Sequence, residues 1–129
     1  MNNVLSILKA LSDRNRLRTV YALMAHDELC AFQIIELLQI RGATVSRHLS
    51  QLVNAGILKS RKHGRWIYFS LDKANVILHP VMAWIANELG DDGDLVNDRN
   101  TLKKIVASDP EDICRKQRGE ACCPRRQNN

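Results

Sequence analysis

Apolar residues recur at helical spacing through most of the first ninety positions, and the clearest pattern lies between 43 and 53. Its apolar positions are Val45, Leu49, Leu52 and Val53. Steps of four, three and one residue place them on one face of a helix, with polar side chains on the other. Gly56 follows the last apolar turn, where a left-handed cap needs no Cβ. The pattern predicts an amphipathic helix that ends just before Gly56.

After this helix, the spacing of apolar residues changes from the helical period to every second residue. Aromatic and β-branched residues alternate between 66 and 71, as is typical of a strand. Residues 57–61 are its expected partner and 62–65 the turn, because Gly64 can take a positive φ. Upstream, 34–38 should form a short helix and Arg41-Gly42 a turn. The predicted fold class is mainly α (α+β), a winged helix-turn-helix with a two-stranded β wing.

Two further helices are expected before this unit. The first is marked by the apolar residues Val4, Leu5, Leu8 and Leu11. Ser12 is the expected N-cap of the second. That second helix carries Arg14, Arg16 and Arg18, which are read either as solvated charges or as phosphate contacts.

The chain after the hairpin also has a helical pattern. Asp72 is expected to cap a helix running towards Leu89, with Pro80 causing a kink or lying in the first turn of a second start. Another helix, with Asp98 as its cap, should stop at Asp109-Pro110. The last twenty residues show no apolar period.

These elements predict a domain of residues 1–90 for DNA binding and dimerisation. Residues 91–129 are predicted to be a C-terminal extension with a short helix and a cysteine-bearing, inducer-binding tail. The N-terminal helix and the last core helix are each too apolar to face water alone. They either complete the core of one chain or form a homodimer interface, and the dimer is preferred because two reading helices double the DNA contacts.

Charge adds a ligand class to this fold. The whole net charge of +5 lies in residues 1–90, and between Arg41 and Arg65 there are basic residues but no Asp or Glu. A basic hairpin can simply defend an edge strand, but the combination with a polar helix face favours a polyanion, here double-stranded operator DNA. The expected major-groove residues are Thr44, Ser46, Arg47, His48 and Gln51. The expected backbone or minor-groove residues are Arg61, Lys62, His63 and Arg65.

Neither a secretory signal nor an apolar run long enough for a membrane span is evident, so a cytoplasmic protein with no membrane partner is expected. Its cysteines should then be reduced. The sequence contains no C-x2-C redox motif, phosphate loop or carboxylate pair. A DNA-binding protein is therefore favoured over the alternative of a small enzyme or thiol carrier.

Three of the four cysteines lie close together near the C-terminus, at Cys114, Cys122 and Cys123. Three thiols without a nearby histidine favour a soft ion. Trivalent arsenic or antimony takes three thiolates, whereas a structural zinc site normally takes four ligands. The spacing favours such a metalloid as inducer, with no organic cofactor. Zinc bound with Cys30 or a partner chain's residue, and thiol redox sensing, remain alternatives.

Several motifs together resemble the ArsR/SmtB family of metal- and metalloid-responsive repressors. They are Leu8-Lys9-Ala10-Leu11-Ser12-Asp13 with Arg16-Leu17, Glu28-Leu29-Cys30, Thr44-Val45-Ser46-Arg47-His48-Leu49 with Leu52, Ala55-Gly56-Ile57-Leu58 and Gly64-Arg65-Trp66-Ile67-Tyr68. The resemblance covers nearly all of residues 4–90. It implies a homodimeric winged-helix repressor that occupies its operator when empty and leaves it when the inducer binds.

The resemblance also has a departure. Arsenic-responsive members typically carry E-L-C-x-C, and this chain matches at Cys30 but has Phe32 at the second cysteine. Some relatives instead use C-terminal cysteines that include a vicinal pair, and this chain is similar to those. The expectation is a repressor released by trivalent arsenic, antimony or methylarsenite. The alternative is a zinc- or redox-responsive repressor of the same fold.

Overall fold

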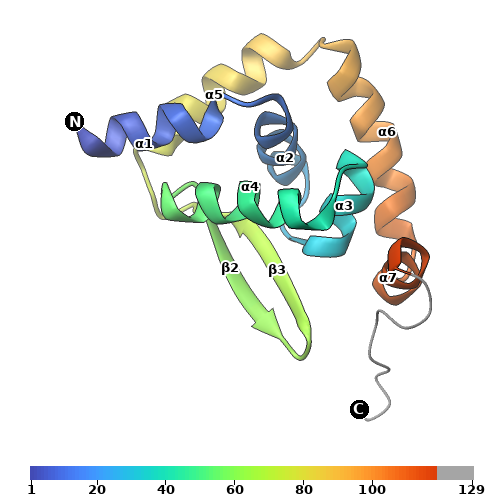
Figure 1. Ribbon diagram of the computed structural model, residues 1–129. Helices are drawn as coiled ribbons and strands as arrows, with labels where there is room; N and C mark the ends of the chain where they lie inside the picture. The colour runs from blue at the N-terminus through green and yellow to red at the C-terminus, as the bar shows by residue number, and fades with distance from the viewer. Residues whose placement is uncertain (119–129) are drawn as a thin grey trace.

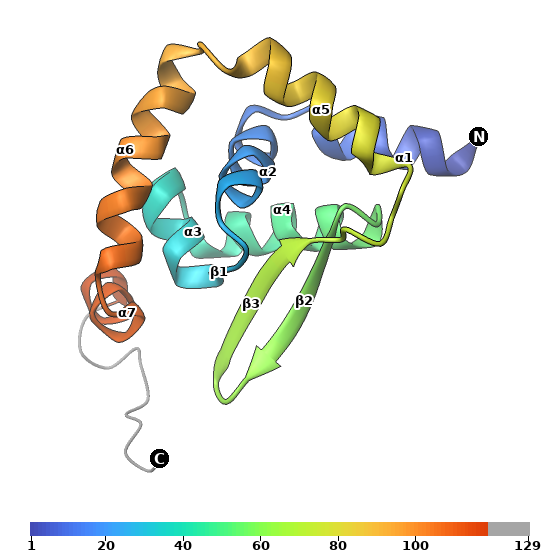
Figure 2. The same cartoon turned by 180° about the vertical axis from the view of Figure 1, so that it is seen from behind.

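A computed structural model describes residues 1–118, which form seven helices and a small antiparallel sheet whose β2–β3 hairpin projects from the helices (Figures 1 and 2). The helices are α1 (Asn2–Leu11), α2 (Arg14–Ala25), α3 (Ala31–Leu38), α4 (Gly42–Asn54), α5 (Leu78–Leu89), α6 (Gly93–Ala107) and α7 (Pro110–Arg118). The strands are β1 (Leu29–Cys30), β2 (Leu58–His63) and β3 (Trp66–Leu71). The predicted winged helix-turn-helix is confirmed, with α3 and α4 as its helix pair. None of the helices in residues 1–118 has the length and apolarity that a bilayer span requires.

The core lies between α2, α3 and α4. Val20, Ile34 and Leu52, one from each of these helices, have no exposed surface. The α1 and α5 helices lie at one end of the molecule, and the β2–β3 hairpin projects from the opposite side of α4 (Figures 1 and 2). The hairpin is therefore held at its base by the core while its tip extends away from it.

The end of α4 is closed as its sequence predicts. Gly56 has a φ of +80°, and its N–H donates to the Val53 carbonyl at 3.0 Å. The Ile57 N–H donates to the Leu52 carbonyl, also at 3.0 Å. Together these two bonds form a Schellman motif, which satisfies carbonyls that the helix leaves unpaired. The chain can thus pass directly from α4 into the hairpin.

The sheet is larger than expected, because its strand order is β1-β3-β2 and β1 was not predicted. Leu29 pairs with Phe69, and Cys30 with Tyr68. The first strand of the hairpin also runs further than the predicted 57–61, since His63 pairs with Trp66. Lys62 and His63 therefore extend β2, and only Gly64 (φ +63°) and its successor form the turn. In a two-residue hairpin loop, a positive φ at the first position suits the right-handed twist of the flanking strands.

Three predicted caps were wrong. Ser12 ends α1, and Asp13 caps α2 by accepting hydrogen bonds from the N–H groups of Asn15 and Arg16. Asp72 accepts from the Ala74 N–H in a turn instead of starting a helix.

Helix α5 begins at Leu78, which confirms the predicted second start with Pro80 in its first turn, where the missing N–H costs nothing. The third wrong cap belongs to α6. Asp92, not Asp98, caps α6, and it accepts from the Asp94 and Leu95 N–H groups. Asp98 instead lies inside α6.

The sequence analysis also missed α7. This helix and α6 fold back on the helix-turn-helix, since α6 packs against α2 and α3, and α7 packs against α3. The apolar residues that α7 buries are Ile113 and Cys114. Two adjacent apolar residues give no helical period, which is why the pattern was not visible.

We predict that Gly56→Ala lowers the free energy of unfolding by about 1–2 kcal/mol, because an L-residue is strained at this positive φ. The new Cβ would also lie 3.3 Å from the Asn75 side-chain nitrogen. Urea denaturation at fixed protein concentration measures the change. Gly93→Ala is the control, since its Cβ meets nothing within 4 Å and its φ is not positive. Equal stability of the two variants would contradict the assignment of Gly56 as a left-handed cap.

Candidate nucleic-acid interface and inducer site

The open face of α4 carries a polar strip. Val45, Leu49 and Leu52 are buried, so the helix turns its opposite side to solvent. Ser46, Arg47 and Gln51 are exposed there. Their exposed hydrogen-bonding side chains form a surface that can contact base edges and phosphates. Thr44, at the start of the helix, is half-buried.

The structure places His48 differently from this strip. Its side chain is only 13% exposed. Its Nδ1 lies 3.0 Å from Nη1 of Arg16, and its Nε2 lies 4.0 Å from Oδ1 of Asp13. His48 thus points towards the start of α2, away from the open face. Sequence periodicity alone could not distinguish this orientation from an outward one.

The wing carries exposed basic side chains at its tip. Lys62, His63 and Arg65 are all exposed there. Arg61 is different, because its Nε and Nη2 donate to the two carboxylate oxygens of Glu28 at 2.6 and 2.8 Å. This pair lowers the pKa of Glu28, chiefly through the hydrogen bond from Arg61.

The Arg61 guanidinium also lies 5.0 Å from the centre of the Tyr68 ring. Its charge is therefore partly neutralised within the protein. The sequence run from 41 to 65 contains no acid, but the fold brings Glu28 to Arg61 from 33 positions away.

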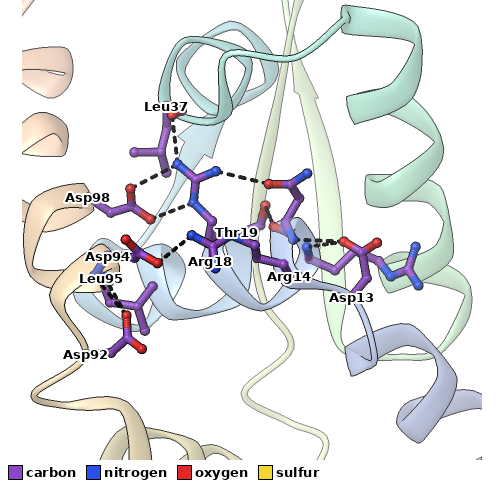
Figure 3. A network of polar contacts seen from close by, with 11 residues as sticks. Asp13, Arg14, Arg18, Thr19, Leu37, Asp92, Asp94, Leu95 and Asp98 are labelled. Atoms are coloured by element: carbon purple, nitrogen blue, oxygen red, sulfur yellow. Dashed lines mark hydrogen bonds and ion pairs between the residues drawn. The ribbon is translucent and has the colours of Figure 1, made fainter.

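Two arginines of α2, Arg14 and Arg18, pair with aspartates of α6, as Figure 3 shows. Arg18 donates to both carboxylate oxygens of Asp98, at 2.9 and 3.0 Å, and to the Leu37 carbonyl at 3.2 Å. Both charged side chains are mostly covered, with 19% and 13% exposed. Arg14 pairs with Asp94 in a solvent-exposed contact, which contributes little to stability. Arg18 therefore has a structural role, and its reading as a phosphate contact is not favoured.

Of the predicted inducer-binding residues, Cys114 lies on α7 and has no exposed surface. Polar contacts hold this part of α7 on α3: the Gln117 amide donates to the Phe32 carbonyl at 2.9 Å, and Lys116 pairs with Glu36 at 2.8 Å. Cys122 and Cys123 lie outside the described residues. Within residues 1–118, no three His, Cys, Asp or Glu side chains come together to hold a metal ion.

Cys30 has a structural position at the start of α3. It has no exposed surface, and its N–H donates to the side-chain oxygen of Gln33 at 2.9 Å. Burial raises the pKa of the Cys30 thiol, which disfavours the thiolate that a metal ion needs. Phe32, at the expected second cysteine, packs edge-on against Trp66 with ring centres 5.6 Å apart. Cys30 is thus part of the core.

A second exposed surface is apolar. On α1, Val4, Leu5 and Leu8 are exposed, Leu8 to 58%. Trp84 on α5 is 63% exposed. Several large apolar side chains that stay in water at one end of a molecule are typical of an interaction site. Both helices lie at the end of the molecule away from the wing tip (Figures 1 and 2).

Comparison with known families agrees with this architecture. The sequence profile described as "Bacterial regulatory protein, arsR family" matches residues 13–60, which span α2, α3, α4 and the start of the wing. The chain belongs to the ArsR family. This confirms the resemblance that its motifs indicate.

Two relatives of this ArsR-family chain are named for resistance to different elements. A cadmium resistance transcriptional regulatory protein CadC homolog of Staphylococcus aureus is 40% identical over 74 residues, 57% of this chain and 61% of that protein. The arsenical resistance operon repressor of Escherichia coli K12 is 27% identical over 116 residues, 85% of this chain and 94% of that protein. The cadmium-type relatives are thus matched over about three fifths of their length. All three of these cadmium-type proteins, like the E. coli repressor, are named as regulators of transcription and not as enzymes.

A solved structure supports the fold of this ArsR-family chain. The winged helix-turn-helix domain Mb0332 from Mycobacterium bovis, described as homodimeric and DNA-binding, aligns with a TM-score of 0.56. The alignment covers 67% of this chain and 81% of that one at 24% identity. At this identity the likeness concerns the fold.

We predict that iodoacetamide modifies Cys30 and Cys114 on the order of 100-fold more slowly than an exposed thiol, because both require local opening first. The exposed reference is Ser60→Cys on β2, where the native serine is exposed. Mass spectrometry of peptides over time gives each rate. If Cys114 reacted as fast as the thiol at position 60, the packing of α7 on α3 would be wrong.

Proposed function

We propose that this ArsR-family chain is a dimeric repressor that binds operator DNA and is released by trivalent arsenic or antimony. The observation that carries the proposal is that two features lie on different parts of one fold. A polar α4 face and basic wing tip lie on one part of the fold, while a buried thiol lies on α7, which packs on the first helix of the helix-turn-helix. The first part binds DNA, and the second alters that binding.

DNA binding is assigned to α4 and the wing. The strip formed by Ser46, Arg47 and Gln51 enters the major groove, because an exposed polar helix face fits its width and donor pattern. The exposed tip residues Lys62 and Arg65 follow the phosphate backbone. Arg61 is left out of this set, because its guanidinium is paired with the Glu28 carboxylate.

A homodimer forms through the apolar surface of α1 and α5. Leu5, Leu8 and Trp84 are exposed there in the single chain, and their burial would be favourable by roughly 25 cal/mol for each Å² removed from water. The domain from M. bovis, which has the same fold, is described as homodimeric and supports association of two chains, while the exposed side chains select the surface. Two copies would present two α4 helices to a palindromic site.

Arsenic is chosen for its coordination chemistry. Cys114, Cys122 and Cys123 supply three sulfur ligands within ten residues, which is the number that a trivalent metalloid takes. The arsenical repressor of E. coli, similar over most of this chain, supports the same class of inducer. Antimony and methylarsenite share the chemistry, and methylarsenite needs only two thiolates.

Ligation at Cys114 has a mechanical consequence. Its sulfur has no exposed surface while α7 lies on α3, so α7 must separate from α3 before the thiolate can reach a ligand with the other two. Because α3 leads directly into α4, the proposed recognition (reading) helix, this separation alters the part of the protein that contacts DNA. To change operator occupancy from 99% to 1%, the inducer must favour the released form by about 5.5 kcal/mol.

A soft divalent ion is the second candidate inducer, and the cadmium resistance relative of S. aureus is the observation that favours it. Cadmium also prefers thiolates but takes four ligands readily. X-ray absorption of the loaded protein separates the two, because arsenic would show three sulfur ligands and cadmium four. Peroxide in the absence of metal tests the redox alternative in the same release assay.

For the DNA interface, we predict that Arg47→Ala and Arg65→Ala each weaken duplex binding and reduce the salt slope of log K by about 0.9 for each phosphate that the arginine neutralises. Fluorescence anisotropy between 50 and 200 mM salt measures both quantities. Arg14→Ala is the matched control, because this exposed arginine pairs with Asp94 on α6. Its slope should equal that of the unchanged protein. If the Arg47 and Arg65 variants kept the salt slope of the unchanged protein, the assignment of α4 and the wing to the DNA interface would be wrong.

For the inducer site, we predict that Cys114→Ala, Cys122→Ser and Cys123→Ser each keep DNA binding but raise the arsenite concentration needed for release at least about tenfold. Cys30→Ala is the control, since it removes an equally buried thiol that lies outside the set. Thermal melting of each variant separates sensing from folding. Normal release by the variant that lacks all three thiols would exclude the site.

A further inference from the structure

The Arg16 side chain makes an unusual set of contacts between three helices. Its Nε donates to the Ala10 carbonyl at 2.6 Å, and its Nη2 donates to the Lys9 carbonyl at 3.2 Å. Both carbonyls lie in the last turn of α1, and that of Lys9 also accepts the Ser12 N–H at 3.2 Å. The third contact is that of Nη1 with Nδ1 of His48 on α4, at 3.0 Å. A single guanidinium from α2 therefore joins α1 to the reading helix.

The chemistry of this contact determines the state of the histidine. A guanidinium has only donors and does not lose its proton in proteins, so Nδ1 of His48 must accept. The ring is then the tautomer with hydrogen on Nε2. That nitrogen is 4.0 Å from Oδ1 of Asp13, which is beyond hydrogen-bond distance. Arg16 is thus the hydrogen-bond partner that orients the ring.

The contact lies beside an opening between the two helices it joins. A groove of about 320 Å³, lined by Ser6, Gln51 and Asn54 among others, separates part of α1 from α4. Side-chain packing therefore does not fill the whole boundary, and the polar contacts of Arg16 cross it. Asp13 fixes the backbone from which Arg16 projects, because it accepts the Arg16 N–H at 3.1 Å.

We propose that Arg16 and His48 are positioning residues that couple α1 to α4, so that His48 orients the reading helix instead of contacting a base. This inference rests on the proposed function. The α1 side of the link carries the exposed apolar residues Leu5 and Leu8. The α4 side carries Arg47 next to His48 and Gln51 one turn later. A shift of α1 against a partner chain is passed through the guanidinium to the residues that face DNA.

The test uses the full chain, a duplex that the unchanged protein selects from a random-sequence pool, and a scrambled duplex of the same composition. Arg16→Lys keeps the charge but cannot bridge three acceptors, and His48→Leu removes the acceptor. Each should weaken binding to the selected duplex about tenfold, the effect of roughly one misplaced base contact. Binding to the scrambled duplex and the salt slope should stay unchanged, because neither side chain neutralises a phosphate.

Two comparisons distinguish positioning from a merely structural effect. His48→Asn restores an acceptor near the Nδ1 position, so it should recover most of the affinity that His48→Leu loses. The double variant Arg16→Lys/His48→Leu should bind no more weakly than the worse single variant, because both changes break one link. Melting curves and sedimentation confirm that the variants are folded and associate like the unchanged protein.

Three results would overturn the link. A salt slope reduced by about 0.9 in either single variant would make that residue a phosphate contact. Additive losses in the double variant, or an asparagine variant as weak as the leucine variant, would show that the hydrogen bond has no positioning effect. If the unchanged protein bound no duplex at low salt, the proposed function itself would fail and the link with it. If the unchanged protein binds DNA but the variants give any of the three results above, the link is overturned and the proposed function is not.

Discussion

The burial of one face of α4 is the constraint on which the rest of this structure depends. Val45, Leu49 and Leu52 insert into the core formed with α2 and α3. Each such side chain gains about 1.5–3 kcal/mol from leaving water. Rotating the helix by one residue would expose the three and cost several times that amount. The polar residues of α4 face outward because no other orientation keeps the apolar ones covered.

Local sequence features predicted this part of the fold well. The helical spacing of Val45, Leu49 and Leu52 and the positive φ of Gly56 both depend on neighbours within one or two turns. The hairpin followed from alternation in the same way, although its turn is shorter than expected. Such features are encoded within about ten residues, and a single sequence is enough to detect them. The family motifs, which include many of the same residues, imply the same fold.

The contacts that the sequence could not predict join residues far apart in the chain. Glu28 reaches Arg61, and Arg18 reaches Asp98 across 80 positions. His48 was expected to face DNA because it lies on the polar side of α4, but a partner 32 residues earlier turns it inward. A charge on a helical wheel has no partner until the fold supplies one. For that reason, the sequence predicted which polar residues α4 and the wing carry, but not which of them are paired within the protein.

Helix α7 shows the same limit in another form. It buries Ile113 and Cys114 with few other apolar residues, and ion pairs such as Lys116–Glu36 help to place it. Its stability therefore comes from a surface on α3 that the sequence of α7 does not reveal. Cys114 lies on the buried side of this helix, whereas the sequence showed only that it belongs to a polar, cysteine-bearing C-terminal segment.

The complete covering of Cys114 sets the sensitivity of the proposed switch. A ligand that needs this sulfur binds only the small fraction of molecules in which α7 has opened, so its apparent affinity falls in proportion to that fraction. Every 1.4 kcal/mol by which α7 prefers its closed position raises the responding concentration about tenfold. At low concentrations of a thiophilic ion, the repressor would thus stay on its operator and transcription would stay repressed. The free energy that holds α7 on α3 would therefore help to set the inducer concentration at which the repressor leaves its operator.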